Sequence, residues 1–298
     1  MSDRVRLDLL DRISRLSTWR RGDEQAPHKP LLLLILLARI QHGDYGPVPF
    51  AAIEDRLRSL LMEFGPSRKS YHPEYPFWHL RSAEIWKVQS PSPLVMRVGH
   101  NAPGIQELRR PGVVGELAPE IVEALRRDPQ LLREIANKIL EGHFPATLHQ
   151  DIATSVGLEL QAAAAAPSAR DPAFRELVLR AYEYRCAVCG FAAQLDGRTL
   201  ALEAAHVQWQ ARGGPCVVEN GIALCPLHHT LLDHGIWSLG PDREIVISAR
   251  ASGQAIDGQL LAFHGRKLNG PQTGMNPVAA PHIKWHQEWV FKGPGRAA

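Results

Sequence analysis

The sequence predicts a mixed α/β (α+β) protein built from two domains. The chain has 298 residues, and domains of about 100 to 150 residues are the commonest. Helical and strand-like patterns both occur along it, and one low-complexity stretch separates two patterned regions. Paired cysteine and histidine knuckles in the second region predict a small domain held together by a metal ion.

The first region is mainly helical in its apolar spacing. Helices are expected at residues 5–13, 30–40, 50–61, 120–127 and 130–141. A short strand is expected at residues 84–88. The longest apolar run, residues 31–38, is too short to span a bilayer and predicts a buried helix instead. No long apolar segment follows the N-terminal residues, so we expect a cytoplasmic protein that does not enter a membrane.

Residues 159–170 mark the boundary between the two domains. They include five consecutive alanines, followed by prolines at positions 167 and 172 that would end a helix. The expected organisation is therefore a first domain at residues 1–158, a linker at 159–170 and a second domain at 171–298. The second domain opens with a helical pattern that leads into Cys186.

A structural zinc site is predicted from spacing alone. Cys186 and Cys189 form a C-x2-C knuckle, and Cys225 and His228 form a C-x2-H knuckle. Two such knuckles complete one tetrahedral Zn²⁺ site. Buried thiols or disulfides are the alternative, but the lack of a secretory segment favours metal. Cys216 is left over, and we expect it to be a bystander.

The net charge is weak for a protein that binds nucleic acid. Thirty-four Lys and Arg residues oppose 31 Asp and Glu residues, for a net charge of +3 at pH 7. Hydrophobic content of 45% and charged content of 22% are typical of a soluble globular protein. Nucleic-acid binding would therefore need a local basic patch and specific contacts rather than a strong overall charge.

Residues 68–80 combine basic residues, four aromatic residues and two prolines. We predict a rigid loop there. Its composition leaves two interpretations open, a phosphate reader that faces a nucleic-acid groove and an aromatic loop of the core.

His206, Asn220 and His229 are interleaved with the zinc ligands, and this pattern resembles the HNH (ββα-metal) endonuclease family. The resemblance implies a strand that ends at His206, a returning hairpin with Asn220, and a helix with His229. The local pattern agrees, because residues 199–207 have the composition of a strand, residues 213–215 that of a turn, and residues 226–232 that of a short helix opened by proline. It implies that His206 takes a proton from water and that His229 holds a divalent ion at the scissile phosphate. Asn220 would either ligate that ion or orient His206.

The sequence departs from the family pattern immediately before the first histidine. Many relatives carry an acidic or histidine ligand there, whereas this chain has Ala205. Glu203, on the strand face of Ala205, is one candidate replacement, and Asp233, one helical turn after His229, is another. A shell that contains histidine would accept Mn²⁺ or another transition metal as well as Mg²⁺.

Residues 12–34, which include His28 and Lys29, and residues 71–80 resemble the sulfur-binding domain of McrA-like type IV restriction endonucleases. The resemblance implies a helical N-terminal DNA reader for phosphorothioate-modified double-stranded DNA and a C-terminal zinc-stapled HNH domain that cuts nearby. His28 and Lys29 would hold the neighbouring phosphate and bases, with help from Arg68 or Lys69.

The same resemblance places Tyr75 and Pro76 at the sulfur, with His79 beside them where a smaller residue is expected in some relatives. Sulfur is larger than oxygen and a poorer hydrogen-bond acceptor, so an apolar cavity accepts it at little cost. An oxygen there would lose its hydration without a replacement bond. His79 therefore predicts a retuned preference for sulfur.

Two other functions compete with this interpretation. An HNH nuclease directed to base-modified DNA, such as methylated DNA, would stack a flipped base on the aromatic residues of the reader. A non-catalytic zinc module that only binds DNA would follow if Ala205 leaves the metal site incomplete. For the nuclease we expect a homodimer, because one HNH site cuts one strand.

Overall fold

A computed structural model describes residues 28–83, 85–99, 101–160 and 172–297. The chain divides into two compact units, Met1–His143 with His149–Ala162, and Phe144–Leu148 with Ala163–Ala298. The predicted helix at residues 5–13 and most of the predicted linker lie outside the described residues. Within the described part of the chain, no helix is long and apolar enough to cross a membrane.

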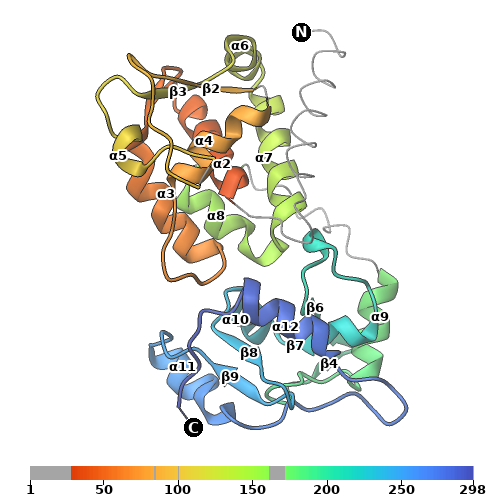
Figure 1. Cartoon of the computed structure of the whole chain (residues 1–298). Coiled ribbons are helices and arrows are strands. Elements are labelled where there is room, and N and C mark those ends of the chain that lie inside the picture. Colours follow the sequence, from red (N-terminus) through yellow and green to blue (C-terminus); the bar gives the residue numbers. More distant parts are fainter. Residues whose placement is uncertain (1–27, 84, 100, 161–171, 298) are drawn as a thin grey trace. The chain divides into compact units, whose positions relative to one another are not determined.

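The first unit is mainly helical, with one small sheet (Figure 1). Its helices are α2 (His28–Gln41), α3 (Phe50–Phe64), α4 (Glu74–His79), α5 (Ile105–Leu108), α6 (Pro119–Arg127), α7 (Pro129–His143) and α8 (His149–Ser155). The 3₁₀ turn η1 (Leu80–Ala83) follows α4. Strands β1 (Val48–Pro49), β2 (Trp86–Gln89) and β3 (Val114–Leu117) form an antiparallel sheet in the order β1-β3-β2.

Helix α2 forms the centre of the first unit. Every residue from Pro30 to Ala38 is buried, as the apolar run predicts, and α2 contacts α3, α4, α6 and α7. On the sheet, a Cβ at Gly115 would lie 1.9 Å from Cζ2 of Trp86. The indole of Trp86 therefore packs directly on the β3 backbone, and its Nε1 donates to the carbonyl of Phe77 at 2.8 Å. This bond ties α4 to the sheet.

Helix α4 corrects the loop prediction for residues 68–80. The proline at position 73 precedes the helix and Pro76 lies in its first turn, where a missing N–H breaks no helical hydrogen bond. Glu74 also favours this end, because the helix dipole stabilises a negative charge there. Phe77 is fully buried, as the interpretation as part of the core expects, whereas Tyr75 and His79 are partly exposed. Phosphate reading by this segment stays a prediction.

The second unit combines short hairpins with helices. The helices are α9 (Pro172–Ala181), α10 (Pro226–Asp233), α11 (Gln254–Gln259) and α12 (Ala280–Trp289). The strands are β4 (Ala193–Leu195), β5 (Arg198–Leu200), β6 (Glu203–His206), β7 (Gly221–Leu224), β8 (Trp237–Leu239) and β9 (Ile245–Ile247). They pair as three antiparallel hairpins, β4-β5, β6-β7 and β8-β9.

The strand expected at residues 199–207 is interrupted. Ala201 has a φ of 51°, which breaks the extended backbone between β5 and β6. The helix expected at residues 226–232 is confirmed as α10, which begins at Pro226.

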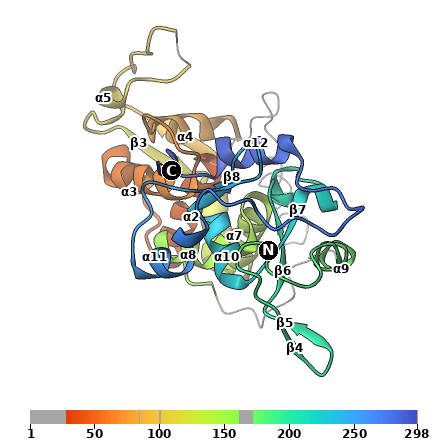
Figure 2. The same ribbon diagram turned by 90° about the horizontal axis from the view of Figure 1, so that it is seen from below.

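Hairpin β6-β7 and helix α10 contact each other in a ββα arrangement. In the hairpin register, Ala205 pairs with Ile222 and His206 with Gly221. A Cβ at Gly221 would lie 2.4 Å from Cγ2 of Val178, so α9 packs against the bare backbone of the hairpin. Figures 1 and 2 both show α9 beside β6 and β7.

Candidate functional site: a metal cluster and a ββα motif

The four predicted zinc ligands lie together. The ligand atoms of Cys186, Cys189, Cys225 and His228 are all within 4.8 Å of one another. Nδ1 of His228 is 3.1 Å from Sγ of Cys225 and 3.6 Å from Sγ of Cys186. On the far side of the ring, Nε2 of His228 lies 3.1 Å from the carbonyl of Gln259. A bond from Nε2–H to this carbonyl points the Nδ1 lone pair at the thiols.

The chemistry of this cluster fits a structural zinc ion. None of the four cysteines, all of which lie in the described residues, forms a disulfide. The hydrogen bond from Cys225 is the largest cause that lowers the pKa of Cys186, to about 3 and against the effect of burial, so this ligand is a thiolate. Three sulfurs and one imidazole nitrogen at this spacing match tetrahedral structural sites, in which protein ligands fill all four positions around zinc.

His206 ends strand β6, and its imidazole is held on one face and at one edge. The ring of Phe174, on α9, stacks on it with centroids 3.9 Å apart and an interplanar angle of 18°. Sγ of Cys216 lies 3.4 Å from Nε2 of His206. Cys216 was expected to be a bystander, and the structure instead places it against the histidine predicted to act as the base.

Asn220 is fully buried, and its side-chain amide holds the loop between β6 and β7. Oδ1 accepts the backbone N–H of Gln208 at 2.8 Å. Nδ2 donates to the carbonyls of Gln208 at 2.9 Å and Pro215 at 3.0 Å. Both amide hydrogens thus bind backbone carbonyls, and the amide fastens the two ends of the loop to each other.

His229 lies between two carboxylates. Its Nδ1 is 2.6 Å from Oε2 of Glu203, and its Nε2 is 3.2 Å from Oδ2 of Asp233. Burial lowers the pKa of His229, but the charge of Asp233 and hydrogen bonds to both carboxylates outweigh it and raise the pKa to about 9. Without a bound ion, His229 is therefore a cation at neutral pH.

The two carboxylates differ in their surroundings. Asp233 is 2% exposed, and its Oδ1 accepts a hydrogen bond from Nε1 of Trp209 at 2.9 Å. Burial raises its pKa, but the neighbouring His229 outweighs this effect and keeps the carboxyl ionised. The Glu203 side chain is 26% exposed. Glu203 is thus the more accessible of the two carboxylates, and together with Nδ1 of His229 it could hold a divalent ion.

In the first unit, several residues assigned to DNA reading gather around α4. The ring of Tyr75 stacks on His72, with centroids 5.0 Å apart, and lies 6.0 Å from His79. Nζ of Lys29 donates to Oγ of Ser82 at 2.9 Å. Burial, and then the charges of Lys29 and Arg81, lower the pKa of His79, so its ring is neutral at pH 7.

The remaining reader candidates lie at the borders of this cluster. Pro76 is buried within α4, and His28 is the first residue of α2. Arg68 and Lys69 are exposed in the loop that precedes α4. The structure thus brings Lys29, Tyr75 and His79 into one cluster, with the two basic residues on the loop that leads to it.

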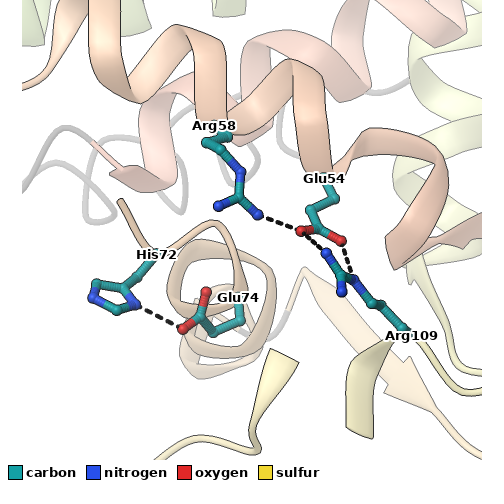
Figure 3. A network of polar contacts seen from close by, with 5 residues as sticks. All are labelled: Glu54, Arg58, His72, Glu74 and Arg109. Atoms are coloured by element: carbon teal, nitrogen blue, oxygen red, sulfur yellow. Dashed lines mark hydrogen bonds and ion pairs between the residues drawn. The ribbon is translucent and has the colours of Figure 1, made fainter. Parts of the chain in front are cut away.

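Two buried carboxylates of the first unit, Glu54 on α3 and Glu74 on α4, bind neighbouring basic side chains (Figure 3). Glu54 of α3 accepts two hydrogen bonds from Arg109, at 2.6 and 2.7 Å, and another from Arg58. These contacts, led by the bond from Arg109, hold the pKa of Glu54 below its usual value despite burial. Nδ1 of His72 lies 2.9 Å from Oε1 of Glu74 at the start of α4. His72, on which Tyr75 stacks, is thus tied to the first residue of α4.

Comparison with known families accounts for both units. The model of the ScoMcrA-like DNA sulfur-binding domain matches residues 6–161, more than half of the chain. The chain belongs to this ScoMcrA-like sulfur-binding family. A second model, of HNH endonucleases, matches residues 186–240, which include the metal cluster and the ββα centre. The resemblances inferred from the sequence are thus confirmed.

Solved structures of sulfur-binding domains are similar to about half of the chain. The sulfur-binding domain of SprMcrA complexed with phosphorothioated DNA is 22% identical, with a TM-score of 0.42, and the match covers 51% of this chain and 94% of that chain. The corresponding ScoMcrA domain is 21% identical, with a TM-score of 0.41, and the match covers 49% and 94%. The chain covers 46% of a longer ScoMcrA chain with sulfur-binding and SRA domains, at 20% identity and a TM-score of 0.41. No curated protein matches the chain.

Several residues of the ScoMcrA-like chain that shape the nuclease centre were not found from the sequence. Phe174 precedes the HNH match and reaches His206 only through the packing of α9 on Gly221. Trp209 follows the predicted strand with no pattern that links it to Asp233. Cys216 could have been suspected, because it was the cysteine left outside the zinc set and lay between His206 and Asn220.

Proposed function

We propose that the chain is a modification-dependent restriction endonuclease that recognises phosphorothioated DNA and hydrolyses a nearby phosphodiester. One observation carries this proposal: a sulfur-binding domain and an HNH endonuclease domain occupy successive parts of the same chain. A protein that only binds modified DNA would need the sulfur-binding domain alone. A nuclease that does not depend on modification would need the HNH domain alone.

The cluster around α4 would bind the modified linkage. Tyr75 and Pro76 offer aromatic and aliphatic surface to the sulfur, and His79 is neutral at pH 7. Oxygen is a stronger hydrogen-bond acceptor than sulfur, so a positive charge at this position would favour an unmodified phosphate. A neutral imidazole adds no such charge. Lys29 lies next to this surface, on the side of Ser82, and would pair with a phosphate oxygen. His28, Arg68 and Lys69 would add contacts to the same backbone.

The ββα centre would perform the hydrolysis. His206 would accept a proton from water while the water oxygen attacks phosphorus and the bond from phosphorus to the 3′ oxygen breaks. Glu203 and Nδ1 of His229 would hold a divalent ion such as Mg²⁺ or Mn²⁺. When bound, such an ion supplies positive charge that offsets the charge developing on the phosphate and the departing oxygen.

Asp233 and Asn220 would support these groups without binding the phosphate. Asp233 accepts from Nε2–H of His229 and is itself held by Trp209, so it would keep Nδ1 of His229 pointed at Glu203. The two predicted roles of Asn220 were ion ligation and orientation of His206. Its amide contacts favour an indirect form of the second, through the loop that follows β6.

A plasmid assay tests this function. Phosphorothioated, methylated and unmodified plasmids are incubated with the protein and either Mn²⁺ or Mg²⁺. Cleavage confined to the phosphorothioated plasmid is expected, whereas cleavage of methylated DNA would support a base-modification reader. Binding without cutting in either metal would support a DNA-binding zinc module.

Matched variants separate reading from cutting. His206→Ala should abolish cleavage and keep binding to phosphorothioated DNA, because it lies in the nuclease centre. Tyr75→Ala should weaken that binding. Cleavage retained by His206→Ala would remove this histidine from the proposed role.

We further propose that double-strand cleavage uses a homodimer, because a single HNH centre cuts one strand. Sedimentation of the protein with a phosphorothioated duplex should then show two chains per DNA. A single chain per DNA that still makes double-strand breaks would refute this.

A further inference from the structure

We infer that Cys216 is a positioning residue for His206, and that its sulfur accepts a hydrogen bond from Nε2–H of the imidazole. The neutral ring then carries its lone pair on Nδ1, which is the nitrogen that takes the proton from water. This inference rests on the proposed nuclease function and deepens it.

The geometry around His206 supports this assignment. The distance of 3.4 Å from Nε2 to Sγ of Cys216 suits a hydrogen bond to sulfur, whose radius exceeds that of oxygen. Phe174 lies flat against the imidazole at 3.9 Å and fixes the plane of the ring. With the plane and one edge fixed, the direction of the other ring nitrogen is fixed as well.

The position of Cys216 is built into the loop and is not an accident of a surface side chain. Asn220 holds the carbonyl of Pro215, the residue directly before Cys216. A Cβ at Gly214 would lie 1.8 Å from the carbonyl oxygen of Gln208, so only glycine allows the loop to close this tightly. The buried amide of Asn220 therefore places the sulfur at the edge of the histidine that ends β6.

The tautomer of His206 decides whether it can act as a base in this place. A neutral imidazole carries one N–H and one lone pair, and a hydrogen bond made by one nitrogen selects which one holds the proton. Nε2 faces the sulfur. Proton transfer from a water at the phosphate therefore requires the lone pair on Nδ1, and a sulfur that accepts from Nε2–H keeps it there.

Side-chain ¹⁵N NMR of the full-length zinc-loaded protein tests this directly. At pH 8.5 the His206 signals, assigned by their loss in His206→Gln, should show the Nε2–H tautomer. A ring protonated on Nδ1 alone, or on both nitrogens, would overturn the inference. This measurement needs no DNA, so it stands even if the plasmid assay finds no cleavage and the proposed function fails.

Kinetics provide the second test. Loss of one hydrogen bond worth about 1 kcal/mol corresponds to roughly fivefold, so Cys216→Ala should lower kcat about fivefold with KM unchanged. Cys216→Ser retains an acceptor and should recover most of kcat and the wild-type tautomer. Val217→Ala, at the exposed neighbouring position, is the control and should match the wild type.

Equal kcat in Cys216→Ala and the wild type would overturn the inference, as would a Ser variant no better than the Ala variant. If Cys216→Ala does not fold, the tautomer of the wild-type protein and of Cys216→Ser still decides the question.

Discussion

Replacing Asn220 by aspartate changes one atom of the side chain and separates two possible roles of this residue. The Asn220 amide makes three hydrogen bonds to the backbone at 2.8, 2.9 and 3.0 Å. Asn220→Asp keeps the oxygen that accepts from Gln208 and replaces the nitrogen that donates to Gln208 and Pro215. A carboxylate oxygen then faces two carbonyl oxygens at a fully buried position.

The expected loss in the free energy of unfolding follows from these contacts. Two lost hydrogen bonds are worth about 1 kcal/mol each, and the two buried carbonyls without a donor add to this. We expect a total loss of about 2 to 4 kcal/mol in the free energy of unfolding of the second unit. Burial of the carboxylate acts in the same direction.

Urea unfolding measures the loss, with tryptophan fluorescence and zinc release as two probes. The midpoint of zinc release should move to lower urea in Asn220→Asp. Asn137→Asp, at an exposed position of α7, is the matched control and should change stability by less than about 0.5 kcal/mol. A wild-type midpoint together with lost cleavage would refute the loop-clamp reasoning, because it would show that Asn220 acts on the bound ion.

Three further predictions concern other parts of the chain. The purified protein should hold one zinc per chain, and Cys189→Ser should release it and lower the melting temperature; zinc retained by that variant would exclude Cys189 as a ligand. Burial lowers the pKa of His286 from 6.5 to about 4, so its neutral form stabilises the fold above pH 6.5 and this stability is lost as the pH falls toward 4. Relative to His286→Gln, the wild type should lose about 2 kcal/mol between pH 7.5 and pH 5 in urea titrations, and an equal pH dependence of the two would contradict this. Gly115→Ala should destabilise the first unit by about 2 kcal/mol or more because its methyl group would overlap Trp86, whereas Gly142→Ala, with open space around it, should stabilise slightly; thermal melts that rank the two variants the other way would refute the packing argument.

Local sequence patterns were sufficient for the features whose parts lie close together along the chain. The two knuckles predicted that Cys186, Cys189, Cys225 and His228 lie together, because residues three apart at a turn present their side chains to the same point. The apolar run at residues 31–38 predicted a buried helix, and Pro226 predicted the start of α10. The spacing of His206, Asn220 and His229 indicated the HNH family, which the family comparison confirms.

Local patterns failed where a short element depends on its neighbours. Residues 68–80 contain prolines and aromatics that suggest a loop, yet α4 forms because its prolines lie before the helix and in its first turn. The burial of Phe77 between Phe50 and Trp86 supplies the stability that six residues lack by themselves. Likewise, one residue in the left-handed region, Ala201, divided a strand that its composition predicted to be continuous.

By itself, the sequence determined the kind of chemistry this protein carries, through ligand types and their spacing. Only the tertiary structure decided which groups act together. Glu203 meets His229 because the register of β6 and the phase of α10 direct both side chains into the same space, and a strand shifted by one residue would point Glu203 away. Cys216 meets His206 because Asn220 closes a loop whose path no local pattern predicts. Contacts between distant residues depend on how whole elements pack, and that packing is a property of the folded chain.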